Sequence, residues 1–106
     1  MMIRVGINGF GRIGRQVYRA IREHYPERID VVAVNDVGNR KIMTHLLKYD
    51  TNYGRFRGDV RATAEGFVAD GDDVQILAER DPARLPWKQL GVEVVIESTG
   101  FFREAA

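Results

Sequence analysis

The stretch from residue 3 to residue 14, IRVGINGFGRIG, constrains the fold more than any other part of the chain. Its first apolar side chains alternate at Ile3, Val5 and Ile7, which is the period of a buried β-strand. The next apolar side chains are four residues apart, as on one face of a helix: Ile13, Val17 and Ile21. The pattern predicts a strand that enters a helix through a glycine-rich turn.

Three glycines with G-x-G-x-x-G spacing occupy this turn: Gly9, Gly11 and Gly14. In a dinucleotide-binding turn the first allows a sharp bend, the second lets a pyrophosphate approach the backbone, and the third lets the helix pack closely on the strand. The N–H groups of Arg12, Ile13 and Gly14 would then face the phosphates. The same spacing also occurs in strand-to-helix turns that bind nothing, so the sequence that follows must decide.

A second apolar segment, DVVAVND at residues 30–36, has the composition of a parallel strand covered on both faces. It ends in Asp36, 22 residues after Gly14, where this fold carries the acid that binds the ribose hydroxyls. A carboxylate there repels the 2′-phosphate of NADP by about 4 kcal/mol at ~4 Å. Asn39 is better placed to cap the next helix, and Arg40 lies near enough to soften the repulsion. The segment therefore favours NAD over NADP.

The rest of the chain predicts an α/β fold of the Rossmann type, with parallel strands in the order 3-2-1-4 and a small antiparallel hairpin. The expected helices are residues 11–24 and 40–48; the strands after the first are 30–35, 74–77 and 92–97; the hairpin is 59–63 with 66–70; and a short helical turn lies within 79–91. The switch point, where dinucleotides bind, then lies between the first and the last of these parallel strands.

The predicted core rests on helical spacing. The first helix would bury Ile13, Val17 and Ile21, and the second Ile42, Met43, Leu46 and Leu47. Both helices would cover one face of the sheet. The other face would be covered only by Leu85, Trp87 and Leu90, so we expect an exposed apolar patch there and an unpaired last strand. A further helix would begin after Thr99 and stop at Ala106, which gives the expectation of a truncated domain over residues 1–106.

Composition limits the possible functions. The net charge of +1 provides no general attraction to nucleic acid or to an anionic membrane. No apolar run reaches the ~20 residues of a membrane span, and the start of the chain lacks a signal-peptide core. The chain has no Cys, which fits a cytoplasmic protein and excludes thiolate metal sites and a cysteine nucleophile within it.

Five motifs in order, GINGFGRIGR, AVND, HLLKYDT-x-YGRF, ERDP-x-x-LPW and VIESTGFF, closely resemble the NAD-binding N-terminal part of glyceraldehyde-3-phosphate dehydrogenase, over nearly all of residues 3–102. Erythrose-4-phosphate dehydrogenase is a close relative. The resemblance implies a parent enzyme of glycolysis that oxidises an aldehyde to an acyl phosphate, reduces NAD and forms a homo-oligomer. It also implies that the catalytic domain of the family lies outside this chain.

The resemblance extends the cofactor site beyond the glycines and Asp36. Arg80 would lie near the adenine, although it could instead form a salt bridge with a neighbouring acid. Thr99 and Gly100 would line the cleft, with Phe101 or Phe102 toward its mouth. The complete set predicted to bind the cofactor is Gly9, Gly11, Arg12, Ile13, Gly14, Asn35, Asp36, Arg80, Thr99, Gly100 and Phe101.

The family reacts through a cysteine thiolate activated by a histidine. Neither His24 nor His45 matches the position of that histidine, so this chain alone is predicted to be inactive and to hold no catalytic residue and no metal. Two other functions stay open at this point. One is a free-standing, non-catalytic module that binds adenine nucleotides, and the other is a structural half-domain that binds nothing well.

Overall fold

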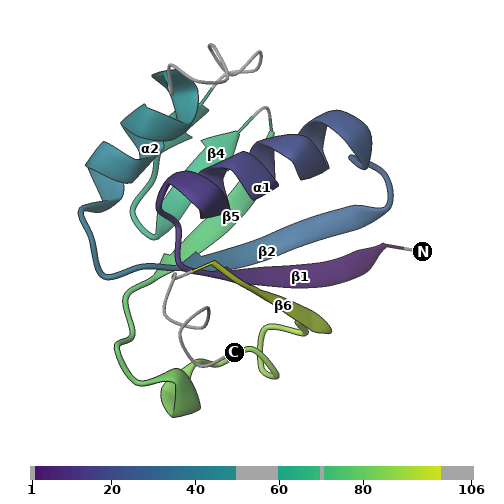
Figure 1. Ribbon diagram of the computed structural model, residues 1–106, viewed down its shortest axis with the longest axis vertical. Coiled ribbons are helices and arrows are strands. Elements are labelled where there is room, and N and C mark those ends of the chain that lie inside the picture. The colour runs from purple at the N-terminus through teal and green to yellow at the C-terminus, as the bar shows by residue number, and fades with distance from the viewer. Residues whose placement is uncertain (1, 50–59, 70, 99–106) are drawn as a thin grey trace.

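A computed structural model describes residues 2–49, 60–69 and 71–98, which form one six-stranded sheet and two α-helices (Figure 1). The elements are β1 (Ile3–Asn8), α1 (Arg12–His24), β2 (Ile29–Asn35), α2 (Arg40–Tyr49), β3 (Val60–Ala62), β4 (Gly66–Ala69), β5 (Asp72–Leu77), the 3-10 turn η1 (Pro82–Arg84) and β6 (Val94–Glu97). Strand and helix alternate at the start of the chain, as the sequence predicts for this fold class.

The sheet has the order β3-β4-β5-β2-β1-β6. Its parallel strands, β5-β2-β1-β6, follow the predicted 3-2-1-4 order. The predicted order is only part of the sheet, because the antiparallel strands β3 and β4 continue it beside β5. Strand β5 also begins at Asp72 and not at Val74, because the turn before it is made by Gly71 at φ 82° and leaves Asp72 and Asp73 free to pair with β4.

The core lies between the sheet and the two helices, where both helices contribute to one buried cluster. Three aromatic rings, from the turn after β1, from α1 and from β4, form its centre. Phe10 stacks on Phe67 with ring centroids 5.7 Å apart, and Tyr18 meets the Phe67 ring edge-on at 5.4 Å. All three side chains are fully buried. Such rings add geometric specificity to the large apolar area that they remove from water.

The buried face of α1 differs from the predicted one. Ile21 is buried and Val17 packs against the core, but Ile13 is 57% exposed and Tyr18 takes the central place. Gly14 explains the rotation, because a Cβ there would overlap the carbonyl of Gly9. The helix must therefore turn its 14-18-21 side toward the sheet, and Ile13 is left outside.

The buried face of α2 is also narrower than predicted. Met43 and Leu47 are buried as expected, whereas Ile42 is 57% exposed and Leu46 is 37% exposed. Thr44 is buried in their place and satisfies its hydroxyl by donating to the Arg40 carbonyl at 2.8 Å. A short helix at the margin of the sheet buries one stripe only, here the 43-44-47 stripe.

The opposite face of the sheet is covered near β1 by the segment that contains η1. The indole of Trp87 lies directly over Gly6, where an added Cβ would overlap the ring. Leu85 and Leu90, from the same segment, are half-buried. The expected covering of this face is therefore seen at Trp87, and Gly6 makes the close approach possible.

The exposed apolar patch predicted on this face stays a prediction. The pocket on this face is lined mainly by polar side chains. The exposed large apolar side chains among the described residues are Met2, Ile3, Ile13, Tyr25, Val37, Ile42, Leu46, Tyr49 and Val94. Among the described strands β6 is an edge, as predicted, and its Val94 is 48% exposed.

Candidate functional site

The glycine turn between β1 and α1 has the geometry that the sequence predicts. Gly9 has φ 95°, a conformation that side-chain-bearing residues rarely adopt. Gly11 is the N-cap of α1, has no atom within 4 Å of an added Cβ, and receives no side-chain cap hydrogen bond. The first bond within the helix runs from the Arg15 N–H to the Gly11 carbonyl at 2.9 Å. The exposed backbone around Gly11 thus leaves room for a ligand at the positive end of the helix.

Asp36 lies beside this turn. One carboxylate oxygen accepts the Phe10 N–H at 2.8 Å, and the other accepts the Gly38 N–H at 2.9 Å. A carboxylate has about four acceptor positions, so two remain for other donors. Helix α2 is capped by Asn39, whose side chain accepts the Ile42 N–H at 3.0 Å. The expectation that Asn39 and not Asp36 serves as the cap is therefore met.

The end of β6 forms the second wall of the crevice. The Ser98 hydroxyl donates to the Gly9 carbonyl at 2.5 Å, and the Ser98 N–H donates to the Asn8 carbonyl at 2.9 Å. These bonds attach the strand after the switch point to the glycine turn. Ser98 is half-buried and also stands close to Gly14, so it helps to set the position of the helix start.

Asn35 was predicted as a cofactor ligand, and the structure gives its side chain several protein partners. Its amide nitrogen donates to the Asn8 side-chain oxygen at 2.9 Å and to the Glu79 carbonyl at 3.0 Å, while its oxygen accepts the Glu79 N–H at 2.9 Å. Asn35 is 6% exposed. A direct contact with a cofactor stays a prediction, and the observed contacts join β2 to the segment after β5.

Arg80 follows Glu79 at this carboxyl edge and is exposed. Within residues 2–49, 60–69 and 71–98 no ion pair includes Arg80, and the nearby pair joins Arg84 to Asp81 at 3.7 Å. The alternative of a salt bridge with a neighbouring acid is thus not seen in this part of the chain. The predicted ligands Thr99, Gly100 and Phe101, and the helix expected after them, lie outside the described residues.

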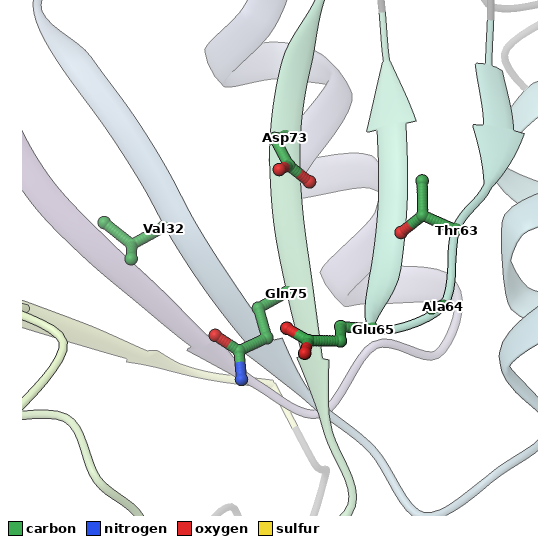
Figure 2. Close-up of a pocket in the computed structure, with 6 residues that line it drawn as sticks. All are labelled: Val32, Thr63, Ala64, Glu65, Asp73 and Gln75. Carbon is green, nitrogen blue, oxygen red and sulfur yellow. The ribbon is translucent and has the colours of Figure 1, made fainter.

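The structure has a pocket of about 350 Å³ away from this edge, on the sheet face opposite α1 (Figure 2). It is lined by Val32, Thr63, Ala64, Glu65, Asp73 and Gln75. None of the predicted cofactor ligands is among these residues. The pocket and the crevice are therefore separate features, one on a face of the sheet and the other at its carboxyl edge.

The resolved pKa shifts lie in the core and not at the crevice. Burial raises the pKa of the Tyr18 phenol, whose hydroxyl donates to Asp72 at 3.1 Å. Burial also raises the pKa of Asp72, against the opposing effect of Arg22 at 3.7 Å. No group of three or more His, Cys, Asp or Glu side chains that could hold a metal ion occurs in the described part of the chain.

Sequence reasoning predicted Asn35 as a cofactor ligand but missed its neighbours Asn8 and Glu97 at the carboxyl edge, although the position of each at a strand end is a signal. Asn8, Asn35 and Glu97 are the last residues of β1, β2 and β6, and each side chain meets its neighbour across the strands. The rule that singled out Asp36, that polar residues at the carboxyl ends of parallel strands meet at one edge, applies equally to this row.

Comparison with known proteins identifies the family. Residues 3–105 match the family described as "Glyceraldehyde 3-phosphate dehydrogenase, NAD binding domain". Relatives named glyceraldehyde-3-phosphate dehydrogenase include one from Thermotoga maritima, 54% identical over 96% of this chain, and one from Streptomyces coelicolor, 52% identical over all of it. The chain spans about 31% of the length of each of these relatives. In the described residues, neither helix has the length and apolar character needed to cross a membrane.

Proposed function

The chain belongs to the glyceraldehyde-3-phosphate dehydrogenase family, and we propose that the edge formed by the glycine turn, Asp36 and β6 is where it binds NAD. The N–H groups at the start of α1, at Arg12, Ile13 and Gly14, would bind the pyrophosphate. The Asp36 carboxylate would accept hydrogen bonds from the adenosine ribose. Arg80 would lie beside the adenine. When bound, the dinucleotide supplies a nicotinamide ring that accepts a hydride.

One contact carries this proposal, the 2.8 Å hydrogen bond from the Phe10 N–H to Asp36. It joins the predicted ribose ligand to the predicted phosphate turn, two groups separated by more than 20 positions in the sequence. The two Asp36 bonds also fix the carboxylate before any ligand arrives, which lowers the entropy lost on binding. The open space around Gly11 suits the close approach of a pyrophosphate.

We further propose NAD and not NADP as the cofactor. Asp36 is half-buried beside the turn. A 2′-phosphate on the adenosine ribose would lie next to this carboxylate. Repulsion between such charges is worth several kcal/mol at close range. Arg40 begins α2 nearby and would weaken the preference without reversing it.

For the parent enzyme we propose the phosphorylating oxidation of a small phosphorylated aldehyde, as the names of the relatives suggest. Those names favour glyceraldehyde 3-phosphate over erythrose 4-phosphate. The present chain has no Cys to attack an aldehyde, so we expect it to bind the cofactor without turning over substrate. It would act as the cofactor-binding domain, and the edge strand β6 with its exposed Val94 would take part in self-association.

Calorimetric titration with NAD, ADP-ribose and NMN tests the proposal. NAD and ADP-ribose should bind and NMN alone should not, because the built contacts serve the adenosine half and the pyrophosphate. Asp36→Ala should weaken ADP-ribose binding by roughly tenfold or more, since a charge-assisted hydrogen bond contributes ~1.5–3 kcal/mol. The matched control is Asp30→Ala at the other end of β2, which should leave binding unchanged. No binding of any adenine nucleotide would refute the proposal.

A further inference from the structure

The last residues of three neighbouring parallel strands form a side-chain ladder across the sheet. Strand register sets Asn8 of β1 opposite Asn35 of β2 on one side and opposite Glu97 of β6 on the other. The Asn8 amide nitrogen lies 3.1 and 3.0 Å from the two Glu97 carboxylate oxygens. The Asn8 oxygen accepts from Asn35 at 2.9 Å, and Asn35 exchanges two hydrogen bonds with the backbone of Glu79.

This ladder has a fixed direction of donors and acceptors. Asn8 and Asn35 are 7% and 6% exposed, so neither amide can exchange a lost partner for bulk water without cost. Glu97 accepts only, which forces Asn8 to turn its nitrogen toward β6 and its oxygen toward β2. Each amide orientation therefore follows from the one beside it.

The residues that follow the ladder are those of the crevice. Gly9 follows Asn8, Asp36 follows Asn35, and Ser98 follows Glu97. A displacement of one strand end relative to another would change the distance between the phosphate turn, the ribose ligand and the β6 wall. The ladder thus lies directly beneath the walls that a dinucleotide crossing the switch point must touch.

We propose that Asn8, Asn35 and Glu97 are positioning residues, which hold the β6 wall in register with the glycine turn for the nicotinamide half of the dinucleotide. This inference rests on the proposed NAD function. The inference predicts different effects on the two halves of the ligand. Binding of the adenosine half depends on Asp36 and the glycine turn, whereas the nicotinamide half must pass the β6 side of β1. The ladder should therefore affect NAD more than AMP.

The decisive experiment reverses the donor and the acceptor in the hydrogen bond between Asn8 and Glu97. Asn8→Asp keeps the acceptor for Asn35 but brings a second carboxylate against Glu97 at ~3 Å, where like charges repel. Adding Glu97→Gln supplies an amide that donates to the new carboxylate. The hydrogen bond between positions 8 and 97 is then restored in the opposite direction. The affinities for NAD and AMP are measured by calorimetry for the unmodified chain, both single variants and the double variant.

We expect Asn8→Asp to weaken NAD binding by roughly tenfold and AMP binding by less than about threefold, and the double variant to recover most of the NAD affinity. Recovery of the NAD-to-AMP affinity ratio is the outcome that a purely structural role would not give. Glu93→Gln, immediately before β6, and Gln75→Glu, in β5, are matched controls and should leave the ratio unchanged. If Asn8→Asp does not fold, the comparison of Glu97→Gln and the double variant with the unmodified chain carries the test.

An unchanged NAD-to-AMP ratio in both single variants would overturn the inference while leaving NAD binding intact. Equal losses for the two nucleotides without recovery in the double variant would overturn it as well. Failure of the unmodified chain to bind either nucleotide would instead refute the proposed function, and this inference with it.

Discussion

The two faces of the sheet differ in the side chains that pack against them. On the helical face, rings and aliphatic side chains from both helices and several strands form one buried cluster, with Phe10, Tyr18 and Phe67 at its centre. On the opposite face the indole of Trp87 lies over Gly6, and a separate pocket is lined mainly by polar side chains (Figure 2). Most of the stability should therefore come from the helical face.

The carboxyl edge of the sheet, where the two faces meet, is held differently from the apolar core. Its contacts are hydrogen bonds between strand ends, such as Ser98 to Gly9 and Asn8 to Glu97. Apolar burial stabilises in proportion to area and has no preferred direction, whereas hydrogen bonds fix direction. The division suggests that changes in the core act on stability and changes at the edge act on binding.

The largest expected effect is the loss of an aromatic ring from the helical face. Phe67→Ala should reduce the free energy of unfolding by about 3–5 kcal/mol, because it removes a fully buried ring and leaves a cavity between Phe10 and Tyr18. Val32→Ala on the open face should cost about 1 kcal/mol or less. Urea unfolding followed by circular dichroism measures both. Equal losses would contradict the contrast between the faces.

The second effect separates the fold from binding within the glycine turn. Gly14→Ala should destabilise the chain by about 2–3 kcal/mol, because the new methyl group would overlap the Gly9 carbonyl. Gly11→Ala has open space and an ordinary extended backbone, so it should cost only a few tenths of a kcal/mol, about the difference between these residues at an N-cap.

The same pair should behave in the opposite way toward ligand. Gly11→Ala should weaken ADP-ribose binding by roughly tenfold in a folded protein, since its methyl group would occupy the approach to the backbone. Calorimetry at a temperature well below the unfolding transition measures this effect. An unchanged affinity of Gly11→Ala for ADP-ribose would contradict the proposal that the pyrophosphate approaches the backbone at this position.

Much of the fold could be predicted because local patterns decided it. The period-two run before Gly9 and the continuous apolar run at 30–35 specify parallel strands, and the right-handed crossover rule then orders them. The rotation of α1 could not be predicted from spacing, because Ile13 and Tyr18 fit helical stripes equally well. A backbone contact between Gly14 and Gly9 chooses between them.

The candidate site was predictable where it relies on a motif and not where it relies on pairing. Gly9 and Asp36 follow from spacing alone. The Asn8–Glu97 contact needs the register of β1 against β6, which joins residues 89 positions apart. The amino-acid sequence alone does not give the register between β1 and β6. The contact between Asn8 and Glu97 therefore follows only from the structure.

A smaller effect should appear on the indole of Trp87. Gly6→Ala would place a methyl group inside the ring's contact distance, so the segment after η1 should move outward at a cost of about 1–2 kcal/mol. Because Trp87 is the only tryptophan in the chain, its fluorescence emission should shift to longer wavelength as water reaches the ring. Gly11→Ala, remote from Trp87, is the control, and an unshifted spectrum in Gly6→Ala would show that the segment is held by other contacts.

The smallest effect concerns two adjacent aspartates on opposite faces. Asp72 accepts from the buried Tyr18 on the helical face, and burial raises its pKa above the ordinary 3.8, while Asp73 lines the open pocket. The folded protein therefore binds more protons at Asp72 than the unfolded chain does above pH 3.8, so this group's contribution to stability falls as pH rises through the folded pKa.

Asp72→Asn keeps an acceptor for the Tyr18 hydroxyl and removes this dependence. Its stability relative to the unmodified chain should improve as pH rises from 4 to 7, by at most about 1.4 kcal/mol per unit, offset in part by the loss of the Arg22 contact at 3.7 Å. Urea unfolding across this range measures the change, with Asp73→Asn as the control for the loss of one negative charge. A relative stability that falls with pH would mean that attraction to Arg22 outweighs desolvation, and that the helical face favours the charge at its margin.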